Sequence, residues 1–180
     1  MNIFVLCTGR CGSVTFVEAC RHITNYTSAH ESLSHAVGAA RFAYPSRHIE
    51  ADNRLSWLLG RLDSVYGDDA FYVHLTRDTM ATARSFLKRF DAGIMHAYRS
   101  SILLGAPKKS ASVESLDFCV DYCETVNSNI DFFLKNKTHT MKFALERASS
   151  DFVEFWERVG AEGDIDNALS QWQIRHNASA

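Results

Sequence analysis

The first fifteen residues, MNIFVLCTGRCGSVT, constrain the fold of this chain more than any other stretch. Residues 3–7 form an unbroken apolar run, which predicts a strand buried on both faces of a parallel sheet. Residues 8–13 contain two glycines and turn the chain, and residues 14–22 are typical of a helix. This order of strand, turn and helix suits an anion, because backbone N–H groups and a helix N-terminus can surround it. Taken alone, the turn is equally compatible with a plain tight connection.

Polar side chains inside the turn favour the anion-binding interpretation. Arg10 adds a cation, and Ser13 and Thr15 add two hydroxyl donors at its exit. The turn differs from a Walker A loop, which requires G-x-x-x-x-G-K-[ST]. Here Gly9 and Gly12 are three residues apart, and Ser13 follows where that loop has lysine.

Length and composition indicate one globular domain over residues 1–180. The net charge of −2 disfavours a general nucleic-acid binder, whose surface is expected to be basic. No apolar run reaches the roughly 18 residues that span a bilayer, and the first strand lacks the basic flank of a signal peptide. The five cysteines form no C-x-x-C pair. We therefore expect a protein of the reducing cytoplasm that binds neither nucleic acid nor membrane.

Alternating strand and helix patterns predict an α/β fold, a three-layer sandwich with a central parallel sheet. The expected strands lie near residues 2–7, 25–29, 71–76 and 139–144, and residues 47–52 form either a short strand or an extended loop. The expected helices cover residues 14–22, 34–43, 53–66, 79–91, 94–104, 115–134 and 149–159. Residues 105–110 are a polar loop, and Cys119 and Cys123 lie on the apolar stripe of the helix 115–134, as core thiols do.

His30 and Glu31 follow the second expected strand. The string HESLSH differs from the zinc-protease motif H-E-x-x-H, because His30 and His35 are five residues apart and lie about 140° apart around a helix. Ligands of open α/β sheets bind at the carboxyl edge, so the pair is a candidate for acid–base chemistry. The alternative is a helix-start glutamate beside a surface histidine.

Arg77 follows the strand near residues 71–76 and stands at the start of a helix, much as Arg10 does. Ser85 lies eight residues further along that helix. An arginine at such a place is equally compatible with a ligand contact and with a surface ion pair or a helix-start contact.

In this order, the motifs resemble those of the sulfotransferase family, P-loop-like enzymes that use 3′-phosphoadenosine-5′-phosphosulfate (PAPS). TGRCGSVT at residues 8–15 is similar to the family loop for the 5′-phosphosulfate, and Arg77 with Ser85 resembles the strand-end Arg and helix Ser that hold the 3′-phosphate. His30–Glu31 resembles a strand-end H-E motif, and MKFALE at residues 141–146 resembles a late strand that ends in Glu. The resemblance implies a P-loop NTPase-like fold and spans residues 3–160.

The resemblance also implies roles for single residues. Arg10 would stabilise charge on the leaving phosphate, and Glu31 would be the general base, with His30 as the substitute. The donor nucleotide would be bound by Thr8, Gly9, Arg10, Cys11, Gly12, Ser13, Val14, Thr15, Arg77 and Ser85. We expect Glu31 to lie near Arg10, directed into the crevice by a helix that begins near Ser32. No metal is implied.

The implied acceptor is a small molecule or carbohydrate with a hydroxyl or amine group, and its identity and the oligomeric state stay open. The sequence departs from the cytosolic members of the family at Arg10, where they carry lysine, and it lacks their late R-K-G element. Two alternatives therefore remain: a nucleotide or nucleoside kinase-like phosphotransferase, and a catalytically silent nucleotide-binding relative.

Overall fold

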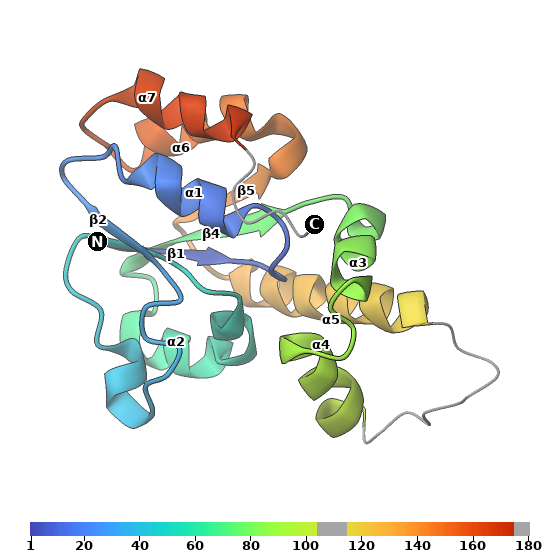
Figure 1. Cartoon of the computed structure of the whole chain (residues 1–180). Helices are drawn as coiled ribbons and strands as arrows, with labels where there is room; N and C mark the ends of the chain where they lie inside the picture. Colours follow the sequence, from blue (N-terminus) through green and yellow to red (C-terminus); the bar gives the residue numbers. More distant parts are fainter. Residues whose placement is uncertain (104–114, 175–180) are drawn as a thin grey trace.

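A five-stranded, all-parallel sheet forms the centre of the computed structural model, which describes residues 1–103 and 115–174 (Figure 1). The strands are β1 (Asn2–Leu6), β2 (Thr27–His30), β3 (His48–Ala51), β4 (Ala70–Thr76) and β5 (Thr140–Ala144), in the order β2-β3-β1-β4-β5. All four expected strands are confirmed within a few residues, and the segment 47–52 is the short strand rather than the loop.

The central strand β1 is buried along its whole length, as its apolar sequence predicts. It pairs in parallel with β3 through Ile3 and Ile49, and with β4 through Phe4 and Tyr72. Helices cover both faces, so the predicted α/β sandwich is confirmed (Figure 1).

One face of the sheet carries α1 (Ser13–Cys20), α6 (Ala148–Arg158) and α7 (Ile165–Ser170) (Figure 1). Its core is rich in aromatic side chains that meet edge to face or tilted, centred on Phe16 and including Phe143, Phe152, Phe155 and Trp172. Burial of each such side chain stabilises the fold by about 1.5–3 kcal/mol. This packing anchors α1, and with it the turn that precedes α1.

The opposite face carries α2 (Leu59–Tyr66), α3 (Thr79–Leu87) and the long α5 (Ser115–Leu134). Its core contains Phe4, Leu62, Tyr72, Tyr122 and Val126. Cys119 and Cys123 are buried in this core as free thiols, as the helical stripe predicts.

Several helix predictions need correction. Within residues 34–43 only Gly38–Phe42 is helical, as a 3-10 turn, and residues 53–66 divide into a 3-10 turn (Asn53–Trp57) and α2. Leu58 separates these two because its backbone (φ −123°, ψ 24°) leaves the helical region. The helix near residues 94–104 is α4 (Gly93–Ala97) continued by a π-turn (Tyr98–Ile102). The sequence analysis missed α7 and a 3-10 turn after it (Gln171–Gln173), and the polar loop 105–110 lies outside the described residues.

The carboxyl ends of the five strands meet at one edge of the sheet. From β1 the chain continues through α1 to β2 on one side, whereas from β4 it continues towards β5 on the other. Neighbouring strands whose connections diverge in this way open a crevice, which is where open α/β sheets bind ligands. Among the described helices, none has the length and apolar character that a bilayer crossing requires.

Candidate functional site

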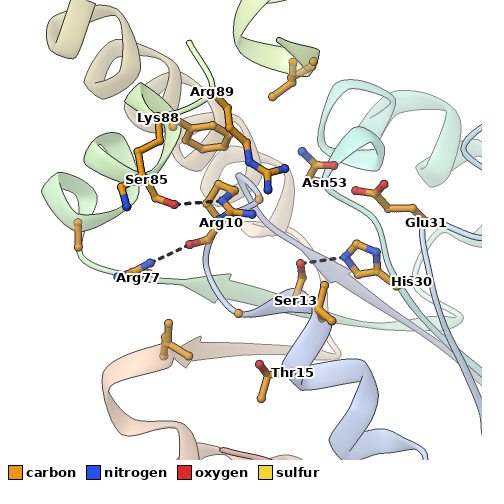
Figure 2. Close-up of a pocket in the computed structure, with 18 of the residues that line it drawn as sticks. Arg10, Ser13, Thr15, His30, Glu31, Asn53, Arg77, Ser85, Lys88 and Arg89 are labelled. Carbon is orange, nitrogen blue, oxygen red and sulfur yellow. Dashed lines mark hydrogen bonds between the residues drawn. The ribbon is translucent and has the colours of Figure 1, made fainter. Parts of the chain in front are cut away.

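A cleft of about 810 Å³ lies at this edge of the sheet. It collects residues from the ends of all five strands and from α3, although they are distant in sequence (Figure 2). Ten of the twelve residues proposed from the sequence line it, namely Gly9, Arg10, Gly12, Ser13, Val14, Thr15, His30, Glu31, Arg77 and Ser85.

The turn after β1 has an unusual backbone. Gly9, Arg10 and Gly12 have φ angles of 85°, 60° and 95°. Left-handed backbone costs a non-glycine residue about 1–2 kcal/mol, so Arg10 is held in a strained conformation. An added Cβ at Gly9 would lie 2.9 Å from Asn53 Nδ2, and one at Gly12 would lie 2.7 Å from Leu145 Cδ1. The positive φ angles therefore favour glycine at both positions, and a larger residue would also have to displace the ends of the Asn53 and Leu145 side chains.

Thr8 and Cys11 are the two proposed residues that do not line the cleft. Thr8 is buried, and its carbonyl accepts a hydrogen bond from the Tyr122 hydroxyl at 2.8 Å. Cys11 packs in the core, where a hydrogen bond with the Cys7 thiol, together with backbone N–H groups of the turn, lowers its pKa. Both residues stabilise the turn from the side of the core, so their proposed role in ligand binding is not supported by the lining of the cleft.

The first turn of α1 is open to the cleft. Gly12 is its N-cap residue and supplies no side chain, so the N–H groups that follow are not capped by a side chain. No acidic residue stands in this first turn to offset the partial positive charge of the helix end. The side chain of Ser13 adds a hydroxyl, and its Oγ lies 3.0 Å from His30 Nε2.

Arg10, Ser85 and Arg77 form one connected group (Figure 2). Arg10 Nε donates to Ser85 Oγ at 3.0 Å, and Arg77 Nη1 donates to the Arg10 carbonyl at 3.1 Å. Burial of the guanidinium, with the nearby charges of Arg89 and Arg77, lowers the pKa of Arg10. Three guanidinium groups held this closely repel one another, and a bound anion would relieve that repulsion.

His30 and Glu31 enter the cleft from the end of β2, on the side away from Ser85 (Figure 2). Glu31 forms an ion pair with Arg54, at 2.6 Å between Oε2 and Nη1. The expectation that a helix begins near Ser32 is wrong. No helix begins at Ser32, because residues 32–35 form turns and Glu31 itself has φ 53°. The left-handed backbone, not a helix start, directs Glu31.

A buried polar network under this turn holds it in place. Glu50 of β3 is fully buried, and its carboxylate accepts hydrogen bonds from the Ser32 N–H at 2.7 Å and the Ser32 hydroxyl at 2.6 Å. His48 Nε2 lies 3.0 Å from the same carboxylate, and His48 Nδ1 lies 2.8 Å from Thr27 Oγ1. Because a carboxylate only accepts, His48 donates to Glu50 from Nε2, and its Nδ1 shares a hydrogen bond with the Thr27 hydroxyl.

Sequence reasoning missed several residues of the cleft. Asn53 and Arg54 follow β3, which has only four residues, so the sequence did not decide between a strand and a loop there. A strand at this position, paired with β1, would have placed both residues at the carboxyl edge of the sheet. Lys88 and Arg89 follow Ser85 by three and four residues, a spacing that predicts a shared helix face. Apolar lining comes from Leu145, Trp172 and Ile174, near the end of β5 and α7.

Glu146, which completes the motif MKFALE, does not line the cleft. Its Oε1 accepts a hydrogen bond from the Asp78 N–H at 2.8 Å. It therefore ties the end of β5 to the start of α3, next to Arg77. Within residues 1–103 and 115–174, no group of three or more His, Cys, Asp or Glu side chains is arranged to hold a metal ion.

Comparisons with family models, with curated proteins and with solved structures gave no significant match.

Proposed function

We propose that this protein is a sulfotransferase that transfers the sulfuryl group of PAPS to a hydroxyl or amine of an acceptor. One observation carries the proposal. Three motifs that were selected separately in the sequence, Gly9–Gly12, Arg77 with Ser85, and His30–Glu31, line one cleft at the carboxyl edge of a parallel sheet. A glycine turn leading from the central strand into α1 is the reason to extend the fold assignment to P-loop NTPase-like.

The half of the cleft over β1 and β4 suits the nucleotide donor. The open first turn of α1, with Ser13 and Thr15, would bind the 5′-phosphate through N–H and hydroxyl donors. Arg77 and Ser85 would bind the 3′-phosphate, which distinguishes PAPS from ATP. The apolar surface of Leu145, Trp172 and Ile174 would receive the adenine base.

The half over β2 and β3 suits the acceptor. Glu31 would accept the proton of the attacking hydroxyl or amine as the new bond to sulfur forms. The bond between sulfur and the bridging oxygen of the 5′-phosphate breaks, and its electron pair leaves with 3′,5′-ADP. Arg10 would stabilise the negative charge that builds on this leaving phosphate. His30, held by Ser13 at 3.0 Å, would orient the acceptor beside the turn.

A kinase-like phosphotransferase would use the same kind of sheet. The residue at the end of β3 helps to distinguish a kinase from a sulfotransferase. Kinases of the P-loop class hold Mg²⁺ through an acidic residue at a neighbouring strand end and a loop Ser or Thr after the loop Lys. At the end of β3, Asp52 is buried and forms an ion pair with Arg41, and it accepts a hydrogen bond from the Arg54 N–H at 2.8 Å. The Asp52 carboxylate is thus occupied by the protein itself.

Thermal unfolding with different nucleotides tests the proposal. Stabilisation by 3′,5′-ADP that exceeds stabilisation by ATP·Mg²⁺ supports it, since a ligand that binds only the folded state raises the unfolding temperature. Transfer of labelled sulfate from PAPS to a panel of phenols, sugars and amines then separates an enzyme from a silent nucleotide binder. Preference for ATP·Mg²⁺ over 3′,5′-ADP would overturn the proposal in favour of the kinase.

A further inference from the structure

The cleft has more positive charge than the proposed donor site uses. Its lining contains one carboxylate, that of Glu31, and six basic side chains, those of Arg10, Arg54, Arg77, Arg84, Lys88 and Arg89. The donor assignment uses Arg10 and Arg77, and Arg54 is paired with Glu31. The donor assignment gives no role to the three other basic side chains of the lining, Arg84, Lys88 and Arg89.

Lys88 and Arg89 lie beyond Ser85, at the end of α3 (Thr79–Leu87). Arg77 stands at the start of the same helix, so basic side chains line the cleft along the whole length of α3. A helix rises about 1.5 Å per residue, which places the end of α3 more than 10 Å from its start. Lys88 and Arg89 therefore extend the basic surface past Ser85.

Arg89 is directed back over the turn. Figure 2 shows its guanidinium close to that of Arg10, on the side that faces Asn53 and Glu31. The charge of Arg89 is among the causes that lower the pKa of Arg10, which agrees with their closeness. Two guanidinium groups side by side form a binding site for an anion, because each offers a planar fork of donors.

We propose that the acceptor of this enzyme is itself an anion, whose carboxylate, phosphate or sulfate group binds Arg89 while its hydroxyl or amine faces Glu31. This inference rests on the sulfotransferase function proposed above. An anionic acceptor must approach a donor that already carries several negative charges, and the repulsion would oppose binding. Cations that remain beside the donor offset it and raise the local concentration of anionic acceptors.

Titration of inorganic sulfate into the protein saturated with 3′,5′-ADP, at constant ionic strength, tests the anion site. Sulfate should bind the complex of the wild-type protein, and Arg89→Gln should weaken it by about 10–100-fold, the value of a charge-assisted contact. Arg89→Lys should recover part of this loss. Arg158→Gln removes the same charge from α6, outside the cleft lining, and should change nothing. Equal sulfate affinity in wild type and Arg89→Gln would overturn the proposal.

Sulfate transfer to matched acceptors tests the substrate class. The pairs are methyl glucuronide against methyl glucoside, and 4-hydroxyphenylacetate against its amide, with a sugar phosphate and a sugar sulfate added to compare anions. Anionic members should be preferred, and Arg89→Gln should remove the preference. If Arg89→Gln slows both members equally, Arg89 acts on the transferred group and the proposal is wrong.

Binding of 3′,5′-ADP tests the sulfotransferase function separately from the anionic acceptor. If the wild-type protein does not bind 3′,5′-ADP, the sulfotransferase function falls, and sulfate titration of the nucleotide-free protein still decides whether Arg89 belongs to an anion site. If 3′,5′-ADP binds and the neutral acceptors are preferred, the function stands and only the anionic acceptor is overturned.

Discussion

The two halves of the cleft are built in different ways. In the donor half, the residues proposed to bind the ligand hold one another: Arg10 donates to Ser85, and Arg77 donates to the carbonyl of Arg10. In the acceptor half, Glu31 directly follows the four-residue strand β2 and itself has a left-handed backbone. The turn that contains it is held by the fully buried Glu50, which accepts a hydrogen bond from the Ser32 N–H and which no ligand would touch.

This difference assigns nucleotide binding to the donor half and positioning of the proposed base to the acceptor half. In the donor half, cationic side chains lie close together and repel one another. A bound nucleotide would relieve this electrostatic repulsion, which favours binding. The acceptor half depends on a polar network inside the protein, where each lost partner leaves a buried group unsatisfied. Changes in the donor half should therefore act on nucleotide affinity, and changes in the acceptor half on turnover.

The largest expected effect tests the acceptor half directly. Glu31→Gln removes the proposed proton acceptor and keeps its shape, so turnover should fall by roughly 10²–10⁴-fold. Binding of 3′,5′-ADP, measured by calorimetry, should stay within about twofold because Glu31 lies outside the donor half.

His30→Ala is the control for Glu31→Gln, and it should cost much less turnover. His30 contacts Ser13 at 3.0 Å, so a modest loss of nucleotide affinity is expected with it. The reverse order of the two variants would make His30 the base and Glu31 a positioning residue through its ion pair with Arg54.

The next effect tests the donor half. Arg77→Ala should weaken 3′,5′-ADP binding by roughly 2–4 kcal/mol, because a charge-assisted forked contact is lost. It should weaken 5′-AMP binding by no more than about 1 kcal/mol, the value of the one hydrogen bond from Arg77 to the turn. Titration calorimetry with both nucleotides measures the difference. Equal losses would show that Arg77 only supports the turn and does not read the 3′-phosphate.

The same difference explains how much could be predicted from the sequence. The apolar run of β1, the glycine turn and Arg77 with Ser85 are local patterns, and the parallel sheet necessarily brings strand ends to one edge. The contacts that position Glu31 are between residues distant in the sequence. Glu50 is a single polar residue in a short segment, and its hydrogen-bond partner Ser32 is 18 residues away, so no local pattern pairs them. Arg54 as the ion-pair partner of Glu31 became visible only once β3 was placed between β1 and β2.

A smaller effect is expected where the buried network meets the acceptor half. Glu50→Gln keeps the shape but removes the charge that holds Ser32 and His48, so the free energy of unfolding should fall by about 1–3 kcal/mol. Turnover of the folded fraction should fall by about tenfold as the turn at Glu31 loosens, whereas 3′,5′-ADP affinity should not change. Urea unfolding and steady-state kinetics measure the two effects. An unchanged turnover would show that the network serves stability alone.

The smallest effect belongs to Asn53, which lies between the two halves (Figure 2). Its Nδ2 donates to the Thr8 carbonyl at a long 3.3 Å, and its Oδ1 is buried and accepts no hydrogen bond from the described residues. Asn53→Ala therefore removes this weak bond and an interaction with the Tyr122 hydroxyl together with one unsatisfied oxygen, and these opposing changes should leave stability within about 1 kcal/mol. If Asn53 couples the halves, Asn53→Ala should instead reduce the effect that bound 3′,5′-ADP has on acceptor affinity. Acceptor binding measured with and without 3′,5′-ADP detects this, and equal coupling in both proteins would show that the halves act independently.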